Sequence, residues 1–210
     1  IGTSSIKIVE LGRGRQSYKL ENYGELKIPI FAGKRIRTFD SSNFFLSNEE
    51  IAESIQEICK EANIQTKQAN FSIPDFNSFF TTFKLPAMSE EELREAIRYE
   101  VRPYIPLPIS EITLDWLVIE GETGRTPLKL LVVAIPNEVI RQYQEIARLA
   151  KLDVKLLEPE VLALSRALIK KPSQRKNKEI QEKISSSIIG LIDIGARSTT
   201  CSIIEEGVLK

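Results

Sequence analysis

Two short segments of this 210-residue sequence carry residue types that bind phosphate, one at the start of the chain and one near its end. Residues 1–7 read Ile-Gly-Thr-Ser-Ser-Ile-Lys, and residues 193–200 read Asp-Ile-Gly-Ala-Arg-Ser-Thr-Thr. A glycine-containing turn between strands exposes backbone N–H groups that suit an anion, and glycine lets the backbone approach it closely. Each turn alone is also typical of an ordinary hairpin. Because the pattern occurs twice, it predicts that two equivalent turns grip a triphosphate from both sides.

The predicted phosphate contacts combine backbone N–H groups, hydroxyls and basic side chains. They are Gly2, Thr3, Ser4, Ser5, Lys7, Gly195, Ala196, Arg197, Ser198 and Thr199. The apolar run 188–192 predicts a central strand covered on both faces, with Asp193 at its carboxyl end, where ligands bind in open α/β sheets. Asp193 is predicted to hold Mg²⁺ through water, because this ion prefers oxygen ligands. No residue is assigned a catalytic role.

Composition excludes several classes of function. The chain has 29 basic and 29 acidic residues, so no net field attracts nucleic acid. The chain has no histidine, so catalytic triads, metal sites and proton shuttles that require histidine are excluded. The longest apolar run, 130–135, is far too short to cross a bilayer. Cys59 and Cys201 are expected to be reduced, buried packing residues.

Turn residues and apolar spacing predict the elements that position these turns. Short strands are expected at 4–11, 16–21 and 23–31, with a break at Asn22. Ser47 is expected to cap a helix that runs to Ala62, and a strand follows at 67–73.

Residues 79–157 read as a self-contained unit of order βαββαβ. A strand at 79–85 precedes a helix that begins at the capping box of Ser89 and Glu92. Strands at 111–119 and 127–135 form a hairpin, Asn137 is expected to cap a helix through Ala150, and a strand follows at 153–157. The next helix, 161–169, is apolar almost all round and is expected to be buried between two layers. Residues 170–187 read as a polar linker.

The two turns resemble the first and second phosphate motifs of the actin-like ATPase superfamily. Within it, the chain resembles the PilM family of type IV pilus assembly proteins, relatives of the cell-division protein FtsA. The middle of the chain carries this resemblance most specifically. Its matching segments are Leu85-Pro86-Ala87-Met88-Ser89, Ala96-Ile97-Arg98-Tyr99-Glu100, Tyr104-Ile105-Pro106, Val133-Ala134-Ile135-Pro136-Asn137 and Leu157-Glu158-Pro159-Glu160. The resemblance covers essentially the whole chain.

The resemblance implies an α/β, actin-like ATPase fold, in which a ribonuclease-H-like lobe carries an inserted βαββαβ subdomain. Residues 1–78 and 158–184 would form the first subdomain, 79–157 the inserted one, and 185–210 the start of an incomplete second lobe. The adenosine-binding segment would lie beyond Lys210. The chain is therefore expected to be an N-terminal fragment that does not hold ATP and Mg²⁺ by itself.

The implied function is that of a cytoplasmic assembly component of a type IV pilus or secretion machine. It would bind ATP and Mg²⁺ between the lobes and would bind the cytoplasmic tail of an inner-membrane PilN-like protein, which would hold it at the membrane. Arg197 stands where the family usually has a small residue, and Thr200 where some relatives have Asp, so hydrolysis is expected to be weak or absent.

Two alternatives stay open. One is an FtsA-like division protein that forms membrane-tethered filaments, and the other is a sugar-kinase-like phosphotransferase. A homo-oligomer is compatible with both the pilus and the division role.

Overall fold

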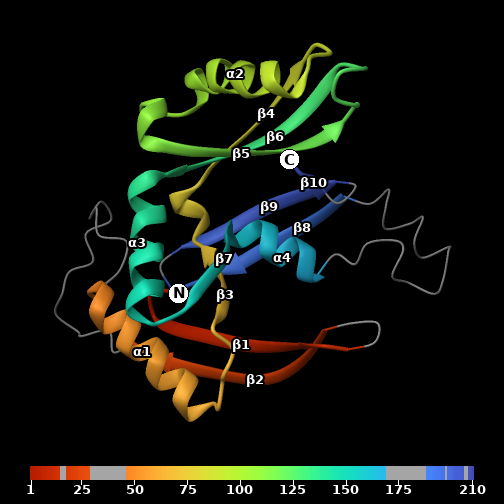
Figure 1. Cartoon of the computed structure of the whole chain (residues 1–210). Helices are drawn as coiled ribbons and strands as arrows, with labels where there is room; N and C mark the ends of the chain where they lie inside the picture. Colours follow the sequence, from red (N-terminus) through yellow and green to blue (C-terminus); the bar gives the residue numbers. More distant parts are fainter. Residues whose placement is uncertain (15–17, 29–45, 169–187, 197, 206–207) are drawn as a thin grey trace, which may run out of the picture. The chain divides into compact units, whose positions relative to one another are not determined.

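The computed structural model describes residues 1–14, 18–28, 46–168, 188–196, 198–205 and 208–210. This part of the chain forms two compact units, and Figure 1 labels their helices and strands. The first unit holds Ile1–Ser72, Val139–Glu158 and Gly195–Ser198, and the second holds Ile73–Glu138, Pro159–Ile194 and Thr199–Lys210. Both contain helices and strands, as the predicted α/β class requires.

The first unit begins with an antiparallel hairpin of β1 (Ser5–Arg13) and β2 (Tyr18–Lys27). The prediction of a strand break at Asn22 is wrong, because β2 runs through this residue. The Asn22 side-chain amide donates a hydrogen bond to the Glu10 carboxylate at 2.6 Å. The pairing of the two strands shifts register between Glu10 and Leu11, which forms a local β-bulge, and β2 continues past it.

Helix α1 (Asn48–Glu61) packs against this hairpin. The predicted cap is confirmed as a full capping box: Glu50 N–H donates to Ser47 Oγ at 3.2 Å, and Ser47 N–H donates to Glu50 Oε2 at 2.7 Å. Gly24 of β2 allows a close approach, since a Cβ there would lie 2.5 Å from Ile58 Cγ2. The buried face of the helix consists of Ile51, Ala52, Ile55 and Ile58.

Strands β3 (Gln68–Ile73) and β7 (Asp153–Pro159) pair with one another. At their amino ends, Asp153 N–H donates to the Lys67 carbonyl at 2.7 Å. Just past their carboxyl ends, Val161 N–H donates to Asp75 Oδ1 at 3.0 Å. Both contacts join residues 86 positions apart, so the strands run in the same direction (Figure 1).

Helix α3 (Asn137–Leu149) leads into β7. The helix is confirmed, but the described hydrogen bonds of the Asn137 side chain do not cap it. Asn137 Oδ1 accepts from Thr113 Oγ1 at 2.8 Å, and its amide donates to the Ser110 carbonyl at 3.0 Å. Tyr143, fully buried on the inner face of α3, meets Phe71 edge-on at 6.0 Å.

The second unit contains a three-stranded antiparallel sheet with β6 in its centre. The strands are β4 (Phe79–Leu85), β5 (Ile112–Glu120) and β6 (Leu128–Pro136). Helix α2 (Glu90–Glu100) begins at the predicted capping box of Ser89 and Glu92. Short 3-10 helices lie at Asp75–Asn77, Arg102–Tyr104 and Ile109–Glu111. The core is apolar throughout: Leu85, Leu93, Ile97, Val101, Ile105, Ile112, Leu128, Leu130, Val132 and Ala134.

The predicted order βαββαβ over 79–157 matches the elements β4, α2, β5, β6, α3 and β7. The last strand, β7, pairs with β3 and not with the three-stranded sheet. Val139–Glu158 accordingly fall in the first compact unit. The proposed assignment of 1–78 with 158–184, 79–157 and 185–210 to three subdomains stays a prediction.

The second unit ends in a sheet of order β10-β9-β8. Its strands are β8 (Ile188–Ile194), β9 (Thr199–Glu205) and β10 (Val208–Leu209). The prediction that β8 is central and covered on both faces is wrong for the described residues: β8 is an edge strand, and Ile192 and Ile194 are exposed. Cys201 of β9 is also exposed and Cys59 is half-buried, which contradicts the expected burial of both thiols.

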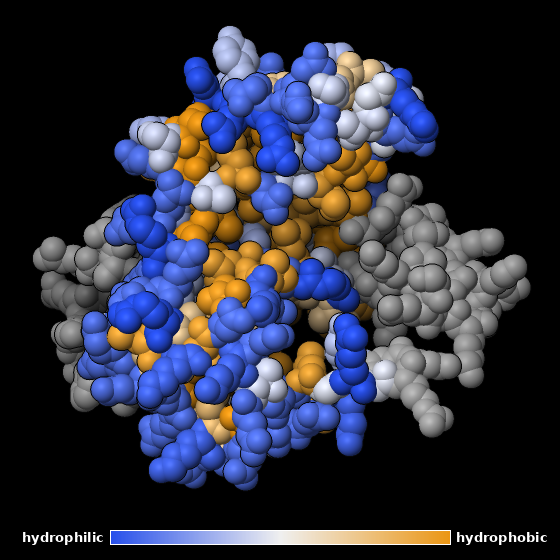
Figure 2. Space-filling model, in the orientation of Figure 1, coloured by the Kyte–Doolittle hydropathy of each residue, from blue (hydrophilic) through white to orange (hydrophobic). Residues whose placement is uncertain are grey.

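Helix α4 (Glu160–Leu168) buries only Val161 among the described residues, so its expected burial on all sides is also wrong. Figure 2 shows hydrophilic side chains over the outward faces of α1 and α2. Of the helices in the described part of the chain, none has the length and apolar composition needed to cross a membrane.

Candidate functional site

The two glycine turns have the same backbone closure. Gly2 N–H donates to the Ser5 carbonyl at 3.0 Å, and Gly195 N–H donates to the Ser198 carbonyl at 3.0 Å. The register of β8 and β9 pairs Ile194 with Thr199, so the second turn lies between these two residues and joins the two strands. The sequence repeat is therefore also a repeat of geometry.

Both turns need glycine because of the opposing carbonyl. A Cβ on Gly2 would lie 3.1 Å from the Ser5 oxygen, and one on Gly195 would lie 3.0 Å from the Ser198 oxygen. Neither glycine has positive φ, so conformational freedom is not the reason. The two glycine N–H groups close the turns, and the predicted role of Gly2 and Gly195 at a phosphate stays a prediction.

Other donors of the turns remain for an anion. Within the described residues, the backbone N–H groups of Thr3, Ser4 and Ala196 have no hydrogen-bond acceptor. The side chains of Ser198 and Thr199 are exposed, while those of Thr3, Ser4 and Ser5 are half-buried. Adjacent N–H and O–H groups on a tight turn are the donor set that a phosphate oxygen requires.

The two basic residues predicted to contact phosphate, Lys7 and Arg197, do not lie among the donors of the turns that the structure describes. Lys7 lies on the exposed face of β1, with its Nζ 3.9 Å from Glu25 Oε1 of β2. Arg197 lies outside the described residues. The residues of both turns, 1–5 and 195–198, belong to the same compact unit.

Asp193 is half-buried in β8, opposite Thr200 in the strand register. Two further carboxylates, Asp75 and Glu160, were not singled out from the sequence. The negative charge of Asp193 is a minor cause that raises the pKa of both. The signal in the sequence was a shared pattern, because each residue directly follows a proline at the carboxyl end of a strand.

Burial is the main cause of both pKa shifts. It raises the pKa of Asp75, against the opposing effect of the Val161 N–H group that donates to this carboxylate. It also raises the pKa of Glu160, against the opposing effect of the positive charge at residue 1, and the charges of Asp75 and Asp193 raise this pKa to a smaller extent. The negative charges of Asp75 and Asp193 therefore disfavour the ionised form of Glu160, an effect that a nearby cation would relieve.

A directly coordinated metal does not fit the described residues, among which no three Asp, Glu or Cys side chains are grouped closely enough to hold one. A hydrated Mg²⁺ fits better, because this ion keeps several waters and needs only one or two carboxylates. Asp193 supplies one such carboxylate.

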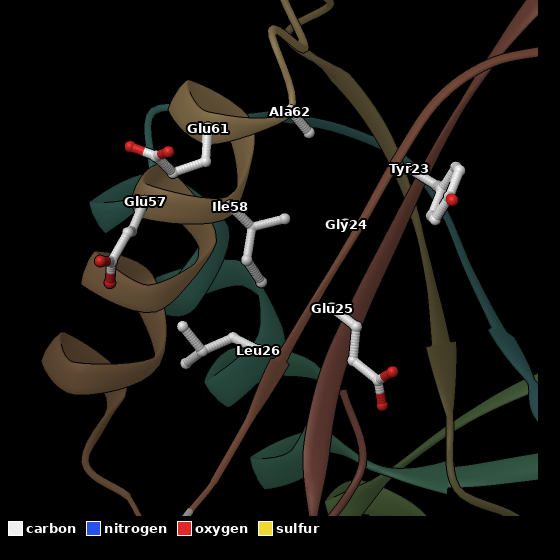
Figure 3. Close-up of a pocket in the computed structure, with 8 residues that line it drawn as sticks. All are labelled: Tyr23, Gly24, Glu25, Leu26, Glu57, Ile58, Glu61 and Ala62. Carbon is white, nitrogen blue, oxygen red and sulfur yellow. The ribbon is translucent and has the colours of Figure 1, made fainter.

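A separate pocket of about 270 Å³ lies between β2 and α1 (Figure 3). It is lined by Tyr23, Gly24, Glu25, Leu26, Glu57, Ile58, Glu61 and Ala62. Figure 3 shows the Glu57 and Glu61 side chains directed away from β2, so their carboxylates do not converge on a ligand. None of the predicted phosphate-binding residues lines this pocket.

Comparison with known proteins decides the family. The family model described as type IV pilus assembly protein PilM matches residues 1–209. The chain belongs to the PilM family. The match extends over both glycine turns and over the middle segments that carried the resemblance.

Solved structures agree on the fold of this PilM-family chain. The structure titled PilM-PilN type IV pilus biogenesis complex matches with a TM-score of 0.76 at 22% identity. It covers 100% of this chain, which spans 58% of the matched chain. The fold is therefore the actin-like one that the sequence resemblance implied.

A more distant match is the cytoplasmic domain of EpsL, an inner-membrane component of the type II secretion system of Vibrio cholerae. Its TM-score is 0.50 at 15% identity, with 76% of this chain and 54% of that one covered. The likeness indicates that the fold occurs in secretion as well as in pilus machinery.

Proposed function

We propose that this chain is the nucleotide-binding part of a cytoplasmic, PilM-type assembly component of a type IV pilus, with ATP and Mg²⁺ held at the two glycine turns. The observation that carries the proposal is the identical closure of the two turns, each with a 3.0 Å hydrogen bond from glycine to serine. Family membership supports the pilus role over the division and sugar-kinase alternatives.

In this proposal the chain's own groups bind and orient the nucleotide. The free N–H groups of Thr3, Ser4 and Ala196 and the hydroxyls of Ser198 and Thr199 donate to phosphate oxygens. Asp193 holds a hydrated Mg²⁺, and the ion supplies charge neutralisation of the phosphates. The described residues offer donors for binding, and nucleotide serves as a structural or switching ligand, with hydrolysis weak or absent.

The proposed partner is the cytoplasmic tail of an inner-membrane PilN-like protein. A protein of the matched complex assembles with PilN, and this supports the same partner class for a chain of the same family. Through that tail the protein would lie at the cytoplasmic face of the inner membrane. An extended tail that docks on a groove or a sheet is an ordinary mode of peptide recognition.

Calorimetry with Mg-ATP on the full-length protein tests the nucleotide site. Asp193→Ala is expected to abolish binding, because it removes the carboxylate that holds the hydrated ion. Asp115→Ala is the matched control: Asp115 is exposed, and its Oδ1 accepts only from the neighbouring Trp116 N–H. Unchanged affinity in Asp193→Ala would overturn the assignment of Asp193. Tight binding by the 210-residue chain alone would instead contradict the expectation that this chain does not hold the nucleotide by itself.

A pull-down with the N-terminal tail of a PilN-like protein tests the partner. Capture by the full-length protein is expected, together with no nucleotide-dependent filaments in sedimentation. Filaments without capture of the tail would favour the division-protein alternative.

A further inference from the structure

The β1–β2 hairpin has two faces, and only one of them packs against α1. Residues directly opposite one another in an antiparallel pair have their side chains on the same face. On the side of α1 lie the buried Ile6 and Gly24, which approaches Ile58. On the other, outward face the register places three pairs: Val9 with Tyr23, Leu11 with Leu20, and Arg13 with Tyr18. Among the described residues, the five apolar side chains of this outward face stay exposed.

The β-bulge of the hairpin brings these apolar side chains to one face. The register skips Glu21, which is the extra residue of β2. Because side chains alternate along a strand, a regular β2 would place Glu21 and Lys19 on the same face as Tyr23. Leu20 and Tyr18 would then point towards α1. The bulge reverses this, so two apolar side chains replace two charged ones on the outward face.

Side-chain hydrogen bonds hold the bulge in place. Asn22 follows the extra residue, and its amide donates to Glu10 Oε2 at 2.6 Å. The other carboxylate oxygen, Glu10 Oε1, accepts from Thr66 Oγ1 at 2.7 Å and from Thr66 N–H at 3.2 Å. The register that makes the outward face apolar is therefore fixed by specific contacts.

The charges around the outward face are positive at both ends of the hairpin. Arg13 and Lys27 are exposed and lie on the same face as the apolar pairs. Lys7 also lies on this face, but Glu25 opposite it offsets its charge, with Nζ and Oε1 3.9 Å apart. A surface with an apolar middle and positive ends is complementary to an apolar stripe with acidic flanks.

An apolar face of this size calls for a covering element. Domains bury the apolar faces of their sheets against further layers, and monomeric proteins rarely leave a large contiguous apolar patch exposed. Residues 29–45 and 169–187 lie outside the described residues, and both are net basic in sequence, so they lack the acidic flanks that the positive ends favour. The chain spans 58% of the matched PilM chain, so a related protein has further segments to supply the cover.

We propose that the outward face of the β1–β2 hairpin is the docking surface for an amphipathic helix with acidic flanks, supplied by the part of the full-length protein outside residues 1–210. The apolar stripe of this helix packs on the pairs of Val9 with Tyr23 and Leu11 with Leu20. The hairpin then lies between two helices, α1 and the docked one. The proposal does not depend on nucleotide binding.

Cysteine reactivity in the purified full-length protein tests this cover. In a Cys59→Ser, Cys201→Ser background, Leu11→Cys reports on the outward face. Leu117→Cys is the matched control, because Leu11 and Leu117 are 55% and 58% exposed. A maleimide is expected to modify Leu11→Cys at least about 10-fold more slowly than Leu117→Cys, since a covered thiol reacts only after local opening. Equal rates in a folded, monomeric protein would overturn the proposal.

The same rates separate this cover from other occupants of the face. Slow modification of Leu11→Cys in the monomer, independent of protein concentration, supports a helix of the same chain. Protection that appears only as a dimer forms would assign the face to a second copy. Protection that appears only with phosphatidylglycerol vesicles would assign it to a membrane. Either of these last two results would overturn the proposal.

A charge reversal tests the acidic flanks of the docked helix. Arg13→Glu is expected to speed the modification of Leu11→Cys by about 3-fold or more, because like charges then face one another at the end of the hairpin. Arg141→Glu, at an exposed position of α3, is the control and is expected to leave the rate unchanged. An Arg13→Glu protein with the native rate would overturn the acidic chemistry of the cover.

Discussion

At the scale of single residues, the glycine of each turn is fixed by one opposing carbonyl oxygen. Gly195→Ala places a methyl group 3.0 Å from the Ser198 oxygen, whereas Gly190→Ala in the preceding strand, β8, meets nothing within 4 Å. Both substitutions restrict the unfolded chain equally, so their difference isolates the close contact. Gly195→Ala is expected to be less stable than Gly190→Ala by about 1 kcal/mol in urea unfolding. Equal stability of the two would contradict the geometry.

The buried carboxylate Glu160 gives stability a recognisable pH dependence. Its pKa is raised in the folded protein, chiefly by burial, so the folded state binds the proton more tightly than the unfolded one. The resulting stabilisation is present at low pH and is lost as pH rises through the raised pKa. Glu160→Gln is therefore expected to lose less stability than the native protein between about pH 4 and about pH 7. Unfolding by urea at several pH values measures this slope.

Glu145 provides a control of opposite sign. The hydrogen bond from Arg148 lowers the pKa of its carboxyl, so its contribution is present above the unfolded pKa and is lost as pH falls. Glu145→Gln is expected to gain less stability with rising pH than the native protein. Slopes that change in the same direction for both variants would contradict these assignments.

At the scale of elements, helix α2 depends on the capping box that opens it. Glu92 N–H donates to Ser89 Oγ at 3.3 Å, and Ser89 N–H donates to Glu92 Oε2 at 2.8 Å. Ser89→Ala removes the first bond and is expected to cost about 1 kcal/mol in the free energy of unfolding. Ser110→Ala is the control, because Ser110 uses only its backbone carbonyl, toward Asn137. A loss equal to that of the control would show that the cap is dispensable.

Elements set by neighbouring residues were predictable, and those set by distant ones were not. The capping boxes at Ser47 and Ser89 lie within three residues of sequence, so spacing alone revealed both helix starts. The partner of β7 is β3, far away in sequence, and the periodicity of a strand does not say which strand it joins. The apolar run of β8 likewise showed that the strand is hydrophobic, but it could not show which elements, if any, cover its two faces.

In the candidate site, too, the features formed by adjacent residues were predictable and those formed by distant residues were not. Its two turns could be found because the repeat is written in adjacent residues. Asp75 was missed because its role depends on a contact across 86 positions.

At the scale of the whole molecule, stability is distributed unevenly. β6 lies between two partner strands, and six of its residues 128–134 are buried and apolar, of which four (Leu128, Leu130, Val132 and Ala134) belong to the core. The β1–β2 hairpin exposes Val9, Leu11, Tyr18, Leu20 and Tyr23. Native-state hydrogen exchange is expected to show β6 amides opening with at least about 2 kcal/mol more free energy than those of β2. Equal protection would mean that the chain unfolds as one cooperative unit.

The thiol on β9 has a practical consequence. Cys201 is exposed, and the preceding residue, Thr200, is the cross-strand partner of Asp193 in the register of β8 and β9. The other cysteine, Cys59, is half-buried, and burial, with the charge of Glu10, raises its pKa and so reduces its reactive thiolate at neutral pH. A maleimide dye or spin label is therefore directed to Cys201 in the native sequence. The protein carries its own attachment point for a spectroscopic reporter, one residue from the cross-strand partner of the proposed magnesium-binding carboxylate.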